Sequence, residues 1–118
     1  MPSERPVDRL RDILDNIERI NRYAAGTDAR RFASDTLRQD AIERCLLRIS
    51  EAARKLGDEA ERLMPDQPWP AIRSIGNILR HEYDAVDPAV IWRLIDGDLG
   101  RLEAAVSKAL AALAGRPA

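Results

Sequence analysis

The residues best suited to chemistry lie in one short segment, GNILRHEYD, and in the turn before it. The segment contains the only histidine of the chain, His81. Helical spacings of three, four and seven place five polar residues on one face: Arg73, Asn77, Arg80, His81 and Asp84. Two permanent cations, an amide, an imidazole and a carboxylate would therefore project together from one helix.

This combination suits phosphate chemistry, of which cleavage of RNA is one case. The planar guanidinium of arginine donates hydrogen bonds to phosphate oxygens, and histidine exchanges a proton near neutral pH. RNA cleavage needs no metal when a base activates the ribose 2′-hydroxyl and cations stabilise the charge at phosphorus. One histidine, one cysteine and dispersed carboxylates form no obvious metal site. We therefore expect neither a metal nor another cofactor.

The spacing alone also allows a structural interpretation. A lone histidine on a polar helix face is often only solvated, and Arg80 with Asp84 would form a surface ion pair of small energy. We interpret three other distinctive side chains as packing residues: Trp69, Trp92 and Cys45. The residue pattern by itself leaves the catalytic and the solvated interpretations of His81 open.

The elements that carry these residues are predicted to be helices throughout. Apolar residues recur at spacings of three and four, and no stretch alternates as a strand would. Proline and capping residues at the starts, and glycines at the ends, predict helices over residues 6–25, 36–56, 68–83 and 88–113. Residues 58–64 either continue the second helix beyond Gly57 or form a further turn. Residues 27–35 are expected to be a polar linker.

The apolar stripes predict the core. The second helix has the widest stripe, which indicates contact with more than one neighbour. Gly97 and Gly100 weaken the last helix, and a close approach of another helix would explain them. The predicted stripes are Val7, Leu10, Ile13, Leu14, Ile17 and Ile20 in the first helix, Leu37, Ala41, Ile42, Cys45, Ile49, Ala52, Ala53 and Leu56 in the second, and Ile72, Ile75 and Leu79 in the third.

Residues 1–118 are therefore predicted to form one all-α domain, an up-down bundle of four to five helices. Long helices in a short chain leave much apolar surface, which favours a homodimer. The net charge of −1 gives no global attraction to nucleic acid, so any RNA contact must be local. No apolar run approaches the ~20 residues that span a bilayer, and the N-terminus lacks the apolar part of a signal peptide. We expect a cytoplasmic protein without a membrane contact.

Two longer segments resemble a known family. RISEAARKL and PWPAIRSIGNILRHEYDAVDPAVIW are similar to the HepT-like branch of the HEPN superfamily. The signature of that branch is R-N-x-x-x-H-x-Y, and Asn77, His81 and Tyr83 match it in register. The resemblance extends over nearly the whole chain and implies a HEPN-like helical bundle.

The resemblance also implies a function. HepT-like proteins are toxins of type VII toxin–antitoxin pairs and act as metal-independent ribonucleases, with two motifs facing a shared cleft in a homodimer. Their partner, an MntA-like nucleotidyltransferase antitoxin, attaches AMP to the motif tyrosine, which is Tyr83 here, and blocks the cleft. In this scheme His81 is the general base or acid, Asn77 orients it or donates to a phosphate, and Asp84 favours the imidazolium form.

The sequence departs from the signature at its first position, where Gly76 replaces the arginine. Arg80 or Arg73, on the same helix face, would have to provide the phosphate-binding cation instead. The alternative is a catalytically impaired HepT-like protein that only binds its nucleotidyltransferase partner or a nucleotide. A dimeric scaffold without either activity is a third possibility.

Overall fold

A computed structural model describes residues 5–81 and 86–115, except for the side chains of Arg80 and His81. The described residues contain helices and no strand, which confirms the all-α prediction. Along the chain the elements are α1 (Pro6–Ala24), α2 (Ala29–Phe32), α3 (Thr36–Leu56), α4 (Asp58–Leu63), α5 (Trp69–His81), α6 (Pro88–Arg93), the π-helical turn η2 (Leu94–Asp98) and α7 (Leu99–Ala114).

Local signals set most helix boundaries where the sequence predicts them. The Asp35 side chain accepts a hydrogen bond from the Arg38 backbone N–H at 3.0 Å and so caps α3. Gly57 ends this helix with a φ of 57°, a value that favours glycine, and α4 then starts as a separate turn. Asp87 caps α6 in the same way as Asp35 caps α3, immediately before Pro88.

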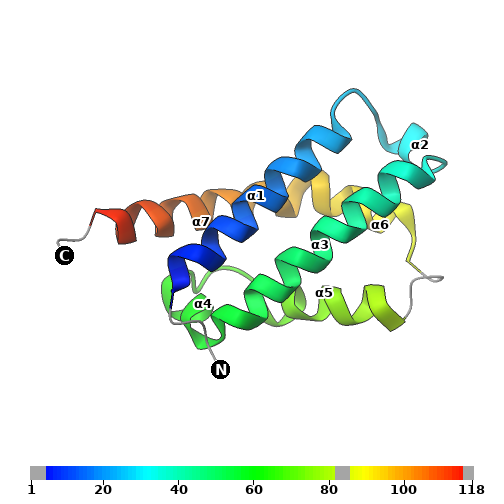
Figure 1. The fold of residues 1–118 in the computed structure, drawn as a ribbon. Coiled ribbons are helices and arrows are strands. Elements are labelled where there is room, and N and C mark those ends of the chain that lie inside the picture. The colour runs from blue at the N-terminus through cyan, green and yellow to red at the C-terminus, as the bar shows by residue number, and fades with distance from the viewer. Residues whose placement is uncertain (1–4, 82–85, 116–118) are drawn as a thin grey trace.

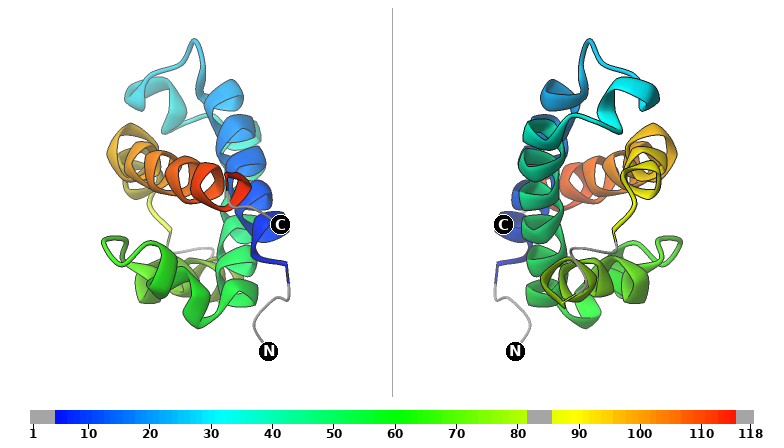
Figure 2. Two further views of the ribbon diagram at one scale, coloured as in Figure 1. Left: turned by 90° about the vertical axis from the view of Figure 1, so that its left-hand side faces the viewer. Right: turned by 90° about the vertical axis from the view of Figure 1, so that its right-hand side faces the viewer.

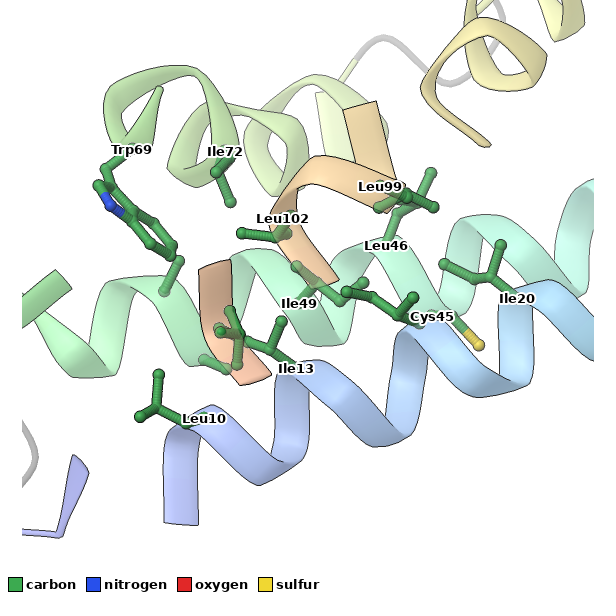
Figure 3. Close-up of a cluster of buried hydrophobic side chains, with 14 of the residues drawn as sticks. Leu10, Ile13, Ile20, Cys45, Leu46, Ile49, Trp69, Ile72, Leu99 and Leu102 are labelled. Atoms are coloured by element: carbon green, nitrogen blue, oxygen red, sulfur yellow. The ribbon is translucent and has the colours of Figure 1, made fainter. Parts of the chain in front are cut away.

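The helices alternate in direction and pack in two layers. α1 and α3 lie side by side, and α5 and α6–α7 cover them on one side (Figures 1 and 2). This arrangement confirms the predicted up-down bundle. Between the layers the apolar stripes of the helices meet in one core (Figure 3). Its fully or almost fully buried members include Leu10, Ile13, Ile17, Ile20, Ile42, Cys45, Leu46, Ile49, Leu56, Trp69 and Val106.

The start of α3 and the segment before it differ from the prediction. The supposed polar linker contains α2, whose Phe32 is fully buried and lies against Trp92 with ring centroids 5.3 Å apart. Leu37, assigned to the buried stripe, is 79% exposed. On the helical wheel it falls with the exposed Arg44 and Arg48 rather than with the core residues of α3.

The last predicted helix is continuous but contains a π-helical turn, η2, between α6 and α7. The expected close approach at its glycines is wrong. A Cβ atom at Gly100 would meet nothing within 4 Å, and one at Gly97 would have only the Arg101 guanidinium, at 3.8 Å, as a neighbour. Gly97 instead lies within the widened turn, a local irregularity that often occurs near functional surfaces.

One polar residue in the core determines how α5 lies on α3. Ser50 is 1% exposed, and its Oγ donates a hydrogen bond to the Arg73 carbonyl at 2.8 Å. The same Oγ accepts a hydrogen bond from the Gly76 backbone N–H at 3.0 Å. Apolar packing alone permits sliding of one helix along another, whereas a paired donor and acceptor fix the relative position. The Ser50 hydroxyl therefore sets where α5 sits along α3.

We expect the Ser50→Ala substitution to lower the free energy of unfolding by about 1–2 kcal/mol, because it removes two buried hydrogen bonds. Chemical denaturation measures this change. Ser107 is exposed on α7, so Ser107→Ala provides a matched control that should stay within about 0.5 kcal/mol of the unsubstituted protein. Equal stability of both variants would contradict the role assigned to Ser50.

Candidate active site on helix α5

Helix α5 begins with an anchored turn. Trp69 is completely buried, and its Nε1 donates a hydrogen bond to the Met64 carbonyl at 2.8 Å. Pro70 occupies the first turn, where its missing N–H costs nothing. From this anchor the helix buries Ile72 and Leu79 on one side. The polar residues of the opposite side are thereby turned toward the surface, and Asn77 is exposed as predicted for a motif residue.

The position of the missing motif arginine is buried. Gly76 lies inside the α3–α5 contact, and its N–H is bonded to the Ser50 hydroxyl as described above. The neighbouring Asn77, in contrast, is exposed. In this chain, position 76 therefore contributes a backbone contact between helices rather than a charge to the polar face.

The Arg73 guanidinium makes a structural contact. Its Nη1 donates to Glu61 Oε2 at 2.8 Å, and its Nη2 donates both to Glu61 Oε1 and to the Gly57 carbonyl at 2.8 Å. These hydrogen bonds with Glu61 raise the pKa of Arg73 and lower the pKa of the Glu61 carboxyl. This bidentate ion pair, together with the bond to the Gly57 carbonyl, joins the start of α5 to the α3–α4 junction. Arg73 thus lies on the predicted face, but its charge is balanced by Glu61.

The C-terminal turn of α5 contains the backbone of Arg80 and His81. The side chains of these two residues lie outside the description, as do Tyr83 and Asp84 altogether. The structure accordingly places Arg80 and His81 about one helical turn beyond Asn77 on the same helix, and leaves the roles of Tyr83 and Asp84 as predictions.

An apolar groove lies beside the polar face, between α5 and the α6–α7 segment. Its volume is about 460 Å³. Ile78 of α5 and Val90 of α6 line it and are 45% and 43% exposed, which is high for large apolar side chains. Leu46 and Ile49 of α3 also contribute to its lining. The motif helix therefore presents an apolar surface next to its polar one.

Other expectations about single residues can be checked within the described ranges. Cys45 is buried, and burial raises the pKa of its thiol, as expected for a small apolar core residue. Trp69 and Trp92 pack against the core, which confirms their interpretation as packing residues.

Residues 5–81 and 86–115 contain no group of three or more histidine, cysteine, aspartate or glutamate side chains placed to hold a metal. Within the same ranges no helix combines the length and the apolar character needed to cross a membrane.

Sequence reasoning missed the residues that support α5 from outside. Ser50 gave one signal, since it is a polar residue within the broad apolar band of α3. Glu61 and Arg54 gave no such signal, because charged residues are common on exposed helix faces and the sequence does not distinguish these two from the others. Arg54 of α3 donates from Nε to the Arg73 carbonyl at 3.4 Å and so lies at the border between α3 and the polar face of α5.

Comparison with protein families shows to which class this helical bundle belongs. The family described as Ribonuclease HepT-like matches residues 13–109, a range that begins within α1, ends within α7 and includes all of α3 and α5. The chain is a member of this family, as the resemblance of its motif segments indicates.

Similar proteins have names that agree with this class. The chain is 31% identical over 101 residues to "Probable ribonuclease HepT" of Thermococcus cleftensis, covering 86% of this chain and 92% of the relative. It is 30% identical over 110 residues to "Putative RNase TTE0752" of Caldanaerobacter subterraneus subsp. tengcongensis, covering 93% and 96%. It is 26% identical over 94 residues to "Putative RNase MJ1380" of Methanocaldococcus jannaschii, covering 80% and 86%. No solved structure gives a significant match.

The Arg73–Glu61 pair predicts a pH dependence of stability. The folded state lowers the pKa of Glu61, so the pair stabilises the fold above the usual glutamate pKa and loses this effect as the pH falls through the lowered value. We expect Glu61→Gln to destabilise the protein at about pH 6 and to differ little from the unsubstituted protein at about pH 3. Denaturant titrations at several pH values measure this difference. A destabilisation that stays constant over that range would show that Glu61 acts by packing rather than by charge.

Proposed function

We propose that this protein is the toxin of a type VII HepT/MntA-like toxin–antitoxin pair and cleaves RNA without a metal ion in the cytoplasm. The observation that carries the proposal is the polar face of α5. On this face Asn77 is exposed, and Arg80 and His81 follow in the last turn of the same helix. Membership in the HepT-like ribonuclease family supports an RNA substrate for this face.

The proposed reaction uses the ribose 2′-hydroxyl as nucleophile. His81 accepts the proton of this hydroxyl, and the 2′-oxygen forms a bond to the adjacent phosphorus. The bond from phosphorus to the 5′-oxygen breaks, and this oxygen takes up a proton from an imidazolium. The products are a 2′,3′-cyclic phosphate and a free 5′-hydroxyl. Asn77 orients His81 or donates to the phosphate, and Asp84 favours the charged imidazole.

The cation at the reacting phosphate is assigned to Arg80. Gly76 has no side chain to offer, and the Arg73 guanidinium is paired with Glu61 and bonded to the Gly57 carbonyl. Arg80 is adjacent to His81 in the chain and lies one turn beyond Asn77. In this assignment Arg73 holds α5 in place, and Arg80 stabilises the negative charge that develops on the phosphate oxygens.

A homodimer is part of the proposal. Ile78 and Val90, large apolar residues that are nearly half exposed, line the groove next to the motif helix. A second copy covering this groove would bury them and would approach α5 from the side adjacent to Asn77 and His81. The polar faces of the two copies would then border one cleft. Each cleft would contain two imidazoles, one from each copy, so that one can act as the base and the other as the acid.

The first test of the function is RNA cleavage in the presence of EDTA. We expect the purified protein to cleave and His81→Ala to reduce the rate by a factor of about 10²–10⁴, since it removes the proton-transferring group. Arg80→Ala should reduce the rate by a factor of about 10²–10³, because it removes charge stabilisation. The rate and the chemical nature of the new RNA ends are measured together, and the ends should be cyclic phosphate and 5′-hydroxyl.

The control for this assay is Arg22→Ala. Arg22 is an exposed arginine at the end of α1, so its loss changes the net charge as Arg80→Ala does. It should leave the rate within about twofold of that of the unsubstituted protein, as surface substitutions usually do. An unchanged rate of cleavage by His81→Ala would contradict the proposed mechanism.

The second test concerns regulation by the partner. Incubation with ATP and an MntA-like nucleotidyltransferase should increase the mass of the protein by one or more AMP units. The chain has two tyrosines, so Tyr83→Phe and Tyr23→Phe form a matched pair. Intact-mass spectrometry should show modification of Tyr23→Phe and none of Tyr83→Phe, because Tyr83 carries the phenol oxygen that attacks the α-phosphate and releases pyrophosphate.

Modified protein should also cleave RNA more slowly than unmodified protein, since a bulky anion then occupies the cleft. Equal modification of the two tyrosine variants, or a modified residue elsewhere in the chain, would refute the assignment of Tyr83.

A second function is favoured by one observation, the burial of Gly76 where the family signature has an arginine. A chain without that cation would retain the fold and bind its nucleotidyltransferase partner or a nucleotide without cleaving RNA. Stable complex formation with the partner, together with no cleavage by any preparation, would identify this second function instead.

A further inference from the structure

The polar face of α5 has little free positive charge along its first half. Gly76 is buried and Arg73 is neutralised by Glu61, as the distances above show. RNA binding depends on cations that meet the phosphate backbone, and the net charge of −1 provides no general attraction. Positive charge for a strand along this half of α5 must therefore come from a neighbouring helix.

Arg54 of α3 meets this requirement. Its Nε donates a long hydrogen bond, 3.4 Å, to the Arg73 carbonyl, which keeps the base of the guanidinium beside α5. The side chain is exposed, and within the described residues its two terminal nitrogens make no hydrogen bond or ion pair. The guanidinium is bonded at Nε and open at both terminal nitrogens, so it can donate two parallel hydrogen bonds to a phosphate. Because the Nε contact already restricts the side chain, binding a phosphate costs less conformational entropy.

Other cations of this region are turned elsewhere or already paired. Lys55 follows Arg54 directly but is rotated by about 100° around α3, toward α1. There it lines a hollow together with Asp12 and Glu51, two carboxylates. Arg38, at the other end of α3, is paired with Asp35 at 2.6 Å. Of these three α3 cations, Arg54 combines contact with α5 and open donors.

We infer that Arg54 binds a backbone phosphate of the RNA strand other than the cleaved phosphate. Its contact at Arg73 lies eight residues before His81, which corresponds to about 12 Å along the helix axis. The strand would therefore run along α5, with one phosphate on Arg54 and the reacting phosphate at Arg80 and His81. This inference rests on the proposed ribonuclease function and adds a substrate-binding residue to it.

The test measures binding of a short single-stranded RNA as a function of salt concentration. His81→Ala protein is used throughout so that the RNA remains intact. Each phosphate contact contributes about 0.7 to the slope of log affinity against log salt for a single strand. We expect Arg54→Gln to reduce this slope by about 0.7 and to weaken binding about fivefold at roughly 0.1 M salt. Arg54→Lys should keep the slope, because it keeps the charge.

Lys55→Gln is the matched control. It removes one charge from the same turn of α3 and affects the helix end equally, but its side chain faces α1. We expect it to leave the slope unchanged. Equal slopes for Arg54→Gln and its His81→Ala parent would overturn the inference. Equal losses in Arg54→Gln and Lys55→Gln would also overturn it, because they would indicate a non-specific effect of net charge rather than a phosphate contact.

The outcomes also separate this inference from the proposed function. If the protein cleaves RNA in a His81-dependent manner and Arg54→Gln keeps the full slope, only the role of Arg54 is wrong. If the unsubstituted protein neither binds nor cleaves RNA, both the function and the role of Arg54 are wrong.

Discussion

The arrangement of the candidate site depends on one contact, the pair of hydrogen bonds between the Ser50 hydroxyl and the backbone of α5. Apolar side chains press α5 against α3 but distinguish poorly between neighbouring positions along the helix. The hydroxyl binds one carbonyl and one N–H of α5, at Arg73 and Gly76. Because helical residues turn by about 100° each, fixing these two residues against α3 also fixes which side of α5 faces the solvent. Asn77 is exposed for this reason.

The same contact changes how charge is distributed over the motif. Position 76 is a buried glycine whose N–H is bonded to the Ser50 hydroxyl, so it contributes no cation to the polar face. The first half of the polar face then has Arg73 as its own cation, and Glu61 and the Gly57 carbonyl bind that guanidinium. In the proposed function, structural anchoring and substrate binding would compete for this single arginine, and its hydrogen bonds to Glu61 and Gly57 assign it to anchoring. In the proposed function, the positive charge that meets RNA therefore comes from Arg80 in the last turn of α5 and from Arg54 on the adjacent helix α3.

Local features of the fold were predictable from the sequence, and contacts between helices were not. Helix starts at Thr36 and Pro88 follow from caps and proline, which act within one turn. The burial of Phe32 was not predicted, because a four-residue helix has no periodicity and its partner Trp92 is distant in the chain. The motif residues on α5 stood out through their spacing and family signature. Arg54 and Glu61 did not, and Ser50 gave only the signal of a polar residue in an apolar band, because the importance of all three comes from their contacts with α5.

The apolar groove and the polar face meet along α5, and this proximity links assembly to chemistry in the proposed function. Ile78 follows Asn77 directly, so the two side chains diverge by about 100° around the helix, and the helical position of His81 falls between them. A second copy that covers Ile78 would therefore border the proposed reacting group without blocking Asn77. Exposed apolar residues on a motif helix are costly for a monomer, because they remain in contact with water. In the proposed homodimer, the surface that covers these residues would also complete the site at which RNA is cleaved.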